Sequence, residues 1–247
     1  MAKLSAVIIT LNAGAQLADC LASLDFVDEI VVVDSGSKDN TLAIAAGRAR
    51  VVNEPWRGFG PQKQFAVAQA RNDWVLCIDA DERVSPALRD EIQRALTAPQ
   101  LNAYAMPRRN RFMGRWLRHG EGYPDWSLRL FDRRHARWSD DAVHEHVVTD
   151  TRVGRLRGDL LHESELDIAT YLDKQNRYTS LQAQRLYERG KRASLRQLLL
   201  NPLIRFIKFY VVRRGFMDGV PGLVHIGIGC FNTFVKYAKL RERARRA

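Results

Sequence analysis

The chain has 247 residues, of which 46% are hydrophobic and 27% charged, a composition that is typical of a globular protein and excludes a disordered one. Its formal net charge of +11 indicates an anionic partner, such as nucleic acid, anionic lipid or a phosphorylated substrate. The three cysteines (Cys20, Cys77, Cys230) are widely spaced, which excludes a disulfide framework and a cysteine-based metal site and fits a reducing cytoplasm. We expect neither a secretory leader after Met1 nor a conventional membrane-spanning helix.

Strands and helices are predicted to alternate through the first hundred residues. Short apolar runs predict strands at 6–11, 29–34, 50–53 and 74–78. Helical patterns occupy the intervals: Leu17, Leu21 and Leu24, then 41–48, then 61–71, and finally a helix that Ser85 caps and Pro86 begins. This order predicts an α/β fold with a mostly parallel sheet and helices on both faces.

Polar side chains follow three of the predicted strands at the point where each strand ends. Thr10 and Asn12 lie at the end of the first strand, Asp34 at the end of the second, and Asp79 and Asp81 at the end of the fourth. Ligands of such sheets bind beyond the carboxyl ends of the strands, so we expect these residues to share one site. The glycine patterns of dinucleotide sites and of P-loops are both absent from the sequence.

The sequence Asp79-Ala80-Asp81-Glu82 places three carboxylates within four residues, directly after a buried strand. Carboxylates this close repel each other, and a divalent cation shared with substrate phosphates would remove that cost. Asp79 and Asp81 lie two residues apart, on one side of an extended chain, and are the candidate metal pair. Glu82 would face the other way and support the turn. The alternative is an ordinary acidic turn with Asp81 and Glu82 exposed.

Three motifs in this half resemble those of the family 2 glycosyltransferases, which have the GT-A fold. The motifs are 6–12 (AVIITLN), 31–41 (VVVDSGSKDNT) and 78–82 (IDADE), and they occur in the order and spacing of the family. Two further stretches, 56–63 (WRGFGPQK) and 143–145 (VHE), are similar to a branch that contains bacterial lipopolysaccharide-core β-glucosyltransferases. The resemblance covers nearly the whole chain and is strongest up to Glu145.

The resemblance implies a site for a nucleotide diphosphate sugar, most often a UDP-sugar. Asp34 would accept a hydrogen bond from the base, and Thr10 and Asn12 would line the same pocket. Asp79 and Asp81 match the D-x-D motif, which holds Mg²⁺ or Mn²⁺ against the diphosphate. Lys63 is a candidate contact to the donor phosphate, and its alternative is a solvated helix lysine. Asp39 is expected to organise its own loop.

Arginines and aromatic residues crowd the segment from Tyr104 to Trp138. Such a segment suits a phosphorylated saccharide acceptor or, alternatively, single-stranded nucleic acid, and most of its arginines can equally form a solvated surface. Arg129 lies in an alternating, strand-like run at 126–131 and is the one arginine that we keep as a site candidate.

The catalytic base of an inverting sugar transfer is predicted in the acidic cluster at 140–146. The resemblance implies a Glu-Asp pair there, whereas this sequence has Val143-His144-Glu145, which leaves Glu145 as the first candidate and Asp141 as the second. His144 and His146 alternate with Glu145 and would face the opposite side of a strand. His162 either completes the metal site, as in some GT-A enzymes, or forms an ordinary hydrogen bond.

The C-terminal third is predicted to be helical and basic. Helical patterns cover 166–189 and 195–214, a short apolar stretch follows at 220–235, and from Arg205 to Ala247 there are ten Lys and Arg residues against two Asp and Glu. This composition favours an interfacial amphipathic helix on an anionic membrane, and the alternative is a helical pair packed on the catalytic domain.

We therefore expect a catalytic domain at 1–165, with a nucleotide-sugar half at about 1–100 and an acceptor half at about 101–165, and a helical extension at 166–247. The expected function is metal-dependent, inverting transfer of a hexose, such as glucose, to a cell-envelope saccharide of the lipopolysaccharide core, on the cytoplasmic face of the bacterial inner membrane. One alternative is transfer to a polyprenyl phosphate. A nucleic-acid-binding protein is the remote alternative, and the sequence contains no recognisable nucleic-acid module.

Overall fold

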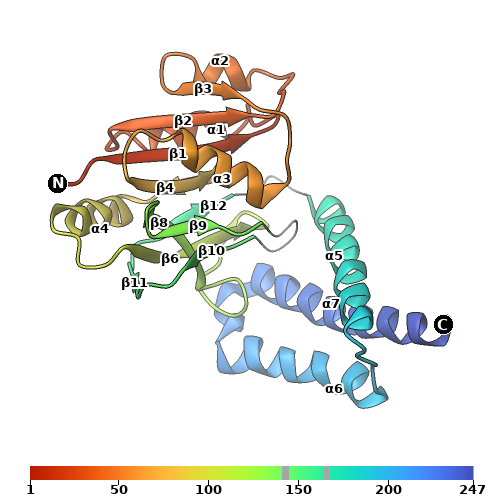
Figure 1. The fold of residues 1–247 in the computed structure, drawn as a ribbon. Coiled ribbons are helices and arrows are strands. Elements are labelled where there is room, and N and C mark those ends of the chain that lie inside the picture. The colour runs from red at the N-terminus through yellow and green to blue at the C-terminus, as the bar shows by residue number, and fades with distance from the viewer. Residues whose placement is uncertain (141–144, 164–166, 247) are drawn as a thin grey trace. The chain divides into compact units, whose positions relative to one another are not determined.

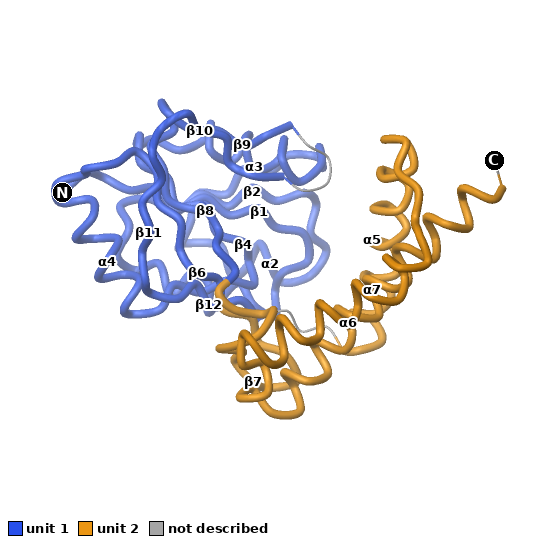
Figure 2. The backbone as a smooth tube through the Cα atoms, turned by 90° about the horizontal axis from the view of Figure 1, so that it is seen from below, with its two compact units in different colours: residues 1–108, 125–163 blue, residues 109–124, 164–247 orange. Residues whose placement is uncertain are grey.

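The computed structural model describes residues 1–140, 145–163 and 167–246. These divide into two compact units (Figure 2). Unit 1 comprises Met1–Arg108 and Asp125–Glu163, and unit 2 comprises Arg109–Pro124 and Ser164–Ala247. The segment Arg109–Pro124, which the sequence places in the acceptor half, therefore clusters with the C-terminal helices.

Unit 1 is built on a mixed sheet (Figure 1) with the strand order β3-β2-β1-β4-β8-β6-β12-β5. Four neighbouring strands are parallel: β3 (Arg50–Asn53), β2 (Glu29–Asp34), β1 (Leu4–Thr10) and β4 (Trp74–Asp79). The strands β8 (Asp125–Asp132), β6 (Ala103–Phe112), β12 (Leu160–His162) and β5 (Glu82–Val84) continue the sheet, with β8 antiparallel to both β4 and β6. The predicted parallel sheet is thus confirmed for the first four strands.

Four short strands complete the described β structure. β11 (Val153–Arg155) pairs in parallel with β6, and β9 (Ala136–Trp138) pairs antiparallel with β10 (Val147–Thr149) as a separate ribbon. β7 (Arg115–Trp116), in unit 2, pairs with the end of β6. The ribbon matters for the site because it brings Trp138 close to the strand ends.

Helices cover both faces of the sheet, as the sequence predicts. The alternation of β1 sends Ala6 and Ile8 into a core with α1 (Leu17–Ala22), α2 (Thr41–Ala45) and α4 (Pro86–Thr97). Val7 points to the opposite core, which is covered by α3 (Phe59–Gln69). Ser85 caps α4 by accepting a hydrogen bond from the backbone of Leu88, as expected.

The register of the sheet aligns the strand ends that carry polar residues. Thr10 is opposite Asp34 across β1 and β2, and Ile9 is opposite Asp79 across β1 and β4. The carboxyl ends of three parallel strands therefore meet at one edge, which is the arrangement predicted for the ligand site.

Unit 2 is helical. It contains α5 (Ile168–Glu188), α6 (Leu195–Phe206), the π-helix η1 (Ile207–Val212), the 3₁₀-helix η2 (Gly215–Asp218) and α7 (Gly219–Arg246), and both α5 and α6 pack against α7. The helix expected at 195–214 is therefore two elements, an α-helix that widens into a π-helix. Within the described residues, no helix combines the length and apolarity needed to cross a membrane.

Asp218 connects the segment 109–124 to the helices of unit 2. Its carboxylate is 1% exposed and accepts hydrogen bonds from the backbone N–H groups of Arg118 and His119, at 2.9 and 2.8 Å. The side chains of His119 and Arg115 lie within 3.3 and 3.8 Å of the same carboxylate. A buried carboxylate with these partners fixes the loop before β8 on η2.

Candidate functional site

Thr10, Asp34 and Ser37 form a buried network at the carboxyl ends of β1 and β2. One carboxylate oxygen of Asp34 accepts hydrogen bonds from the hydroxyls of Thr10 and Ser37, and the other accepts from the backbone N–H groups of Gly36 and Ser37. Burial alone would raise the pKa of Asp34, but these hydrogen bonds outweigh it and lower the pKa below its usual value. Asp34 is therefore a fixed anion that shapes the loop after β2.

Asn12 and Asp39 hold the neighbouring loops. Asn12 has a φ of 52°, accepts a hydrogen bond from the backbone of Lys38 and donates its own N–H to Ser37. Asp39 accepts from the backbone N–H groups of Gly14 and Thr41, so its expected role in organising the loop is confirmed. The two predicted pocket residues of β1, Thr10 and Asn12, thus lie in one hydrogen-bonded network with Asp34.

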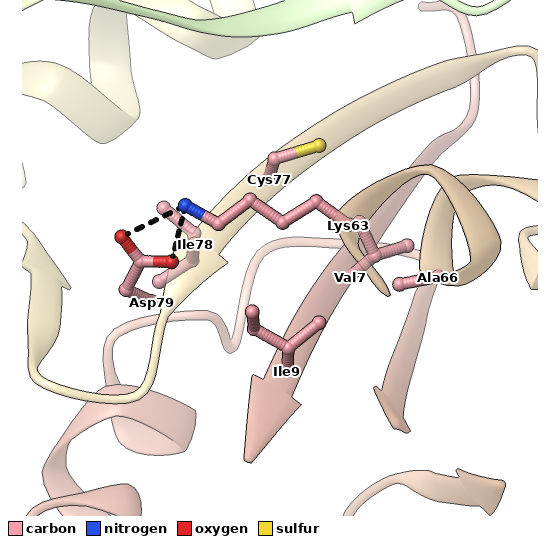
Figure 3. A pocket seen from close by; sticks show the side chains of 7 residues that line it. All are labelled: Val7, Ile9, Lys63, Ala66, Cys77, Ile78 and Asp79. Carbon is pink, nitrogen blue, oxygen red and sulfur yellow. Dashed lines mark hydrogen bonds and ion pairs between the residues drawn. The ribbon is translucent and has the colours of Figure 1, made fainter. Parts of the chain in front are cut away.

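Lys63 connects two carboxylates at the end of β4. Its Nζ atom lies 3.1 Å from Oδ1 of Asp79 and 3.2 Å from Oε1 of Glu145. Figure 3 shows the lysine extending from α3 to Asp79, across a small pocket that is lined by Val7, Ile9, Lys63, Ala66, Cys77, Ile78 and Asp79. The Lys63 side chain is only 8% exposed, so the alternative of a solvated helix lysine is wrong.

Arg129, from β8, contacts Asp79 from another direction. Its guanidinium donates to Oδ2 of Asp79 at 2.7 Å and to Oε1 of Glu82 at 2.9 Å, and the side chain is 6% exposed. Glu82 is fully buried and also accepts the backbone N–H of Asp79 at 3.0 Å, which confirms its expected support of the turn. Arg108 lies 3.6 Å from the same Glu82 carboxylate.

The two cations control the ionisation of Asp79. Burial would raise the pKa of this carboxyl, but the charges of Arg129 and Lys63 outweigh burial and hold the pKa well below its usual range. Burial would likewise lower the pKa of Arg129, and the carboxylates of Asp79 and Glu82 raise it instead. Asp79 and Arg129 therefore both stay ionised throughout the physiological range of pH.

Trp138 lies against both cations and was not singled out from the sequence. The ring centroid is 4.8 Å from Lys63 Nζ and 5.7 Å from the Arg129 guanidinium carbon, and the indole N–H donates to Cys77 Sγ at 3.3 Å. The ring is 3% exposed, so the contact is desolvated and favours the cations. In the sequence, Trp138 is one aromatic residue in a basic segment, and only the pairing of β9 with β10 places it here.

Asp81 and His162 form a second pair beyond the end of β4. His162 Nε2 lies 3.2 Å from Oδ2 of Asp81, and the two side chains are 21% and 29% exposed. A carboxylate beside an imidazole fits two positions in the coordination of Mn²⁺ or Mg²⁺. Within the described residues, no three His, Cys, Asp or Glu side chains are grouped as ligands of one ion, so further ligands would come from substrate or water.

The two carboxylates of the predicted metal pair, Asp79 and Asp81, therefore have different partners. Asp79 is already neutralised by Lys63 and Arg129, whereas Asp81 is paired only with His162 in the contacts described above. The geometry thus favours Asp81 over Asp79 as a direct ligand.

Two predictions fall in or beside the gap at 141–144. Asp141, the second candidate base, and His144 lie outside the described residues. Glu145 and His146 are described, and they precede β10 rather than forming part of a strand, so the expected strand alternation at these residues is wrong. The strand begins only at Val147, which pairs with Trp138. Glu145 is nevertheless brought to the site through Lys63.

Comparison with known proteins identifies the family of this sequence. Residues 5–158 match the sequence model of the family described as Glycosyl transferase family 2. The lipopolysaccharide core biosynthesis glycosyltransferase LpsC of Rhizobium meliloti is 36% identical over 249 residues, which cover 97% of this chain and 92% of that protein. An uncharacterised glycosyltransferase of Rickettsia felis is 34% identical over 256 residues, which cover 98% and 90% of the two chains.

Among solved structures, TarS 1–349 of S. aureus in complex with UDP resembles this chain with a TM-score of 0.50. The likeness covers 99% of this chain and 91% of that one, at 14% sequence identity. At this identity the likeness concerns the fold alone.

Proposed function

Because the chain belongs to glycosyl transferase family 2 and is therefore a glycosyltransferase, we propose that it transfers a hexose such as glucose from a nucleotide diphosphate sugar to a saccharide of the bacterial lipopolysaccharide core. The similarity to LpsC over nearly the whole chain supports the acceptor class. One structural observation carries the proposal: the Glu145 carboxylate is held beside Asp79, at the carboxyl edge of the sheet, by the ammonium of Lys63.

In the proposed reaction, Glu145 is the general base. The acceptor hydroxyl loses its proton to this carboxylate while its oxygen attacks the anomeric carbon, and the bond from that carbon to the diphosphate oxygen breaks with inversion. A positioned base contributes about 10²–10⁴-fold to such a step, or roughly 3–5 kcal/mol of the barrier. The ion pair with Lys63 fixes the direction of the carboxylate before the acceptor arrives.

The cations of the cluster suit the donor diphosphate. Lys63 and Arg129 are buried, charged and held by Asp79, so little reorganisation is needed when a second anion binds beside them. The nucleobase is proposed to bind at the Thr10–Asn12–Asp34 network. Two of the four donors to Asp34 are hydroxyls, which can rotate, so a base N–H can replace either of them without breaking the backbone hydrogen bonds.

Asp81 and His162 are the proposed ligands of the divalent cation, with the diphosphate completing its coordination. A bound cation would neutralise charge on the departing diphosphate. The imidazole ligand favours Mn²⁺ over Mg²⁺, since Mg²⁺ prefers oxygen ligands alone. Asp79 acts indirectly in this proposal, by fixing Lys63 and Arg129.

The proposed location is the cytoplasmic face of the inner membrane, where a lipid-linked core acceptor would be presented. The free cysteines Cys20, Cys77 and Cys230 agree with a reducing compartment. The excess of basic residues after Arg205 agrees with an anionic lipid surface.

The deciding experiment uses the purified full chain with a panel of nucleotide sugars. Donor binding is measured by calorimetry with Mn²⁺, with Mg²⁺ and with a chelator, and transfer to truncated core oligosaccharides follows by mass spectrometry. We expect one donor to bind in a metal-dependent manner and to yield a single added hexose of inverted configuration. Failure of every donor to bind in the presence of metal would refute the proposal.

A further inference from the structure

α6 and η1 expose a row of apolar side chains, whereas the charged side chain of Arg205 on α6 turns inward. Leu195, Leu199, Leu203 and Ile207 recur at every fourth position and are 57%, 52%, 60% and 56% exposed. Ile207 is the first residue of η1, and Val211, also on η1, continues this row and is 55% exposed. We call these five residues the outer row. A helix on the surface of a water-soluble protein normally has the opposite pattern.

The inward side of α6 is fixed by a polar contact. Arg205 forms an ion pair with Glu121 and donates to the hydroxyl of Thr233 on α7, at 3.1 Å. α6 and α7 lie side by side (Figure 1), and a Cβ atom at Gly229 would come within 2.5 Å of the Glu121 carboxylate, which explains the glycine there. The orientation of α6 is therefore set by specific contacts, and the outer row faces away from them.

Further apolar side chains are exposed on the neighbouring elements of unit 2. They are Leu200, Ile204 and Val212 on α6 and η1, Phe216 and Met217 on η2, and Val220, Leu223, Phe231 and Phe234 on α7. Single exposed leucines are common on protein surfaces, but a continuous row with this many apolar neighbours marks an interaction surface.

The charged side chains around the outer row are all positive. From Leu195 to Met217 the sequence contains no Asp or Glu, and Arg196, Lys208, Arg213 and Arg214 are all exposed. Lys208 and Arg213 both lie against the ring of Phe209, at 5.3 and 5.6 Å from its centroid. Cationic groups thus flank an apolar row, as they do in helices that lie in the interface of anionic membranes.

We propose that α6 and η1 form a docking surface for an anionic lipid bilayer, with the outer row entering the headgroup–acyl boundary and the flanking basic residues contacting lipid phosphates. The proposal deepens the membrane location in the proposed function and rests on that part of it. Lipid suits this surface better than a second copy of the chain, because face-to-face pairing would bring Arg196, Lys208, Arg213 and Arg214 against the same cations of the other copy.

The test is co-sedimentation of the full chain with two kinds of vesicle, phosphatidylcholine alone and phosphatidylcholine mixed with phosphatidylglycerol. Leu199→Glu/Leu203→Glu changes two residues of the outer row that make no core contact. The matched control is Leu172→Glu/Leu181→Glu on α5, whose side chains are 37% and 41% exposed. Lys208→Glu/Arg213→Glu tests the cationic flank separately. Circular dichroism checks that each variant is folded.

We expect the unmodified chain and the α5 control to bind anionic vesicles at least about tenfold more tightly than neutral ones. Both α6–η1 variants should lose that binding by a similar factor. Equal vesicle binding by the outer-row variant and the control would overturn the proposal. So would light scattering that shows the unmodified chain as a salt-resistant dimer and the outer-row variant as a monomer. The vesicle assay contains no sugar donor, so the two proposals fail separately. An unmodified chain that binds its donor but no anionic vesicles refutes only the docking surface, and one that binds anionic vesicles but no donor refutes only the proposed reaction.

Discussion

The ammonium of Lys63 lies 3.2 Å from Oε1 of Glu145, a residue 82 positions further along the chain. The same ammonium lies 3.1 Å from Asp79, so one buried cation holds the candidate base beside the acidic end of β4. This arrangement gives Asp79 and Glu145 a common cationic partner, which the sequence alone does not reveal.

Glu145→Gln removes the proposed base and keeps the side chain nearly the same size. We expect kcat to fall by about 10²–10⁴-fold with little change in donor affinity, because Lys63 keeps its ion pair with Asp79 and Arg129 does not contact Glu145. Steady-state kinetics with the identified donor and acceptor, together with calorimetry of donor binding, measure the two effects. A small loss of kcat would instead favour transfer to a polyprenyl phosphate, whose acceptor oxygen needs no strong base.

Lys63→Met removes the cation between Asp79 and Glu145 and leaves both carboxylates without it. We expect the free energy of unfolding to fall by about 1–3 kcal/mol and the donor to bind about tenfold or more weakly. Urea denaturation and calorimetry measure these changes. Lys38→Met, at an exposed lysine of the same unit, is the control and should behave as the unmodified protein in unfolding.

Asp79 makes the stability of unit 1 decrease at acid pH. Its folded-state pKa is depressed, because Arg129 and Lys63 outweigh the effect of burial, so its stabilising contribution is complete above the unfolded-state pKa of about 3.9 and is lost as the pH falls through the folded-state value. Asp34, whose pKa is also lowered, contributes in the same direction. We expect the unfolding free energy to decline below about pH 4.

Asp79→Asn isolates that contribution. The variant should be less stable at pH 7 and should show a shallower decline at acid pH than the unmodified protein. Urea midpoints measured from pH 7 down to the acid limit of solubility test this. Parallel curves for the two proteins would contradict the assignment of the depressed pKa to Asp79.

His162→Ala and Asp81→Asn test the proposed cation ligands. Each should raise the concentration of Mn²⁺ needed for half-maximal donor binding by about 10–100-fold, and saturating Mn²⁺ should restore part of the binding. His135→Ala, at an exposed histidine of unit 1, is the matched control. An unchanged Mn²⁺ requirement in both variants would place the cation elsewhere.

Asp218→Ala tests the contact that holds 109–124 on the helices of unit 2. The change leaves the backbone N–H groups of Arg118 and His119 without their acceptor, and we expect the free energy of unfolding to fall by about 1–3 kcal/mol. Hydrogen exchange at those two amides should quicken, whereas Asp173→Ala, at an exposed residue of α5, should leave them protected. If the loss is local, donor binding in unit 1 will be unaffected.

Local patterns predicted the first four strands and the helices that cover them. The runs Glu29–Asp34 and Arg50–Asn53 match their strands to the residue, because β-branched apolar residues fill the middle of each run and polar residues bound it. The meeting of Thr10, Asp34 and Asp79 at one edge follows from the same topology.

Contacts between distant segments were not predictable in this way. The sequence around Lys63 contains no pattern that would distinguish a buried lysine from a solvated one. Trp138 reaches the site only through the pairing of β9 with β10. Glu145 was expected in a strand because its neighbours alternate, but that ribbon starts two residues later. Local sequence thus specifies the sheet, whereas tertiary pairing specifies the partners of each charge.

The ion pairs around Asp79 also bear on how a growing chain acquires its site. Asp79 is translated 50 residues before Arg129 and Lys63 is translated 82 before Glu145, so the parallel strands emerge from the ribosome with Lys63 available to Asp79 but without Arg129 and Glu145. An N-terminal fragment that stops short of β8 therefore keeps the acidic turn of β4 and lacks the guanidinium that neutralises it. Such a fragment should therefore be less stable and more open to proteolysis than a chain that includes Arg129.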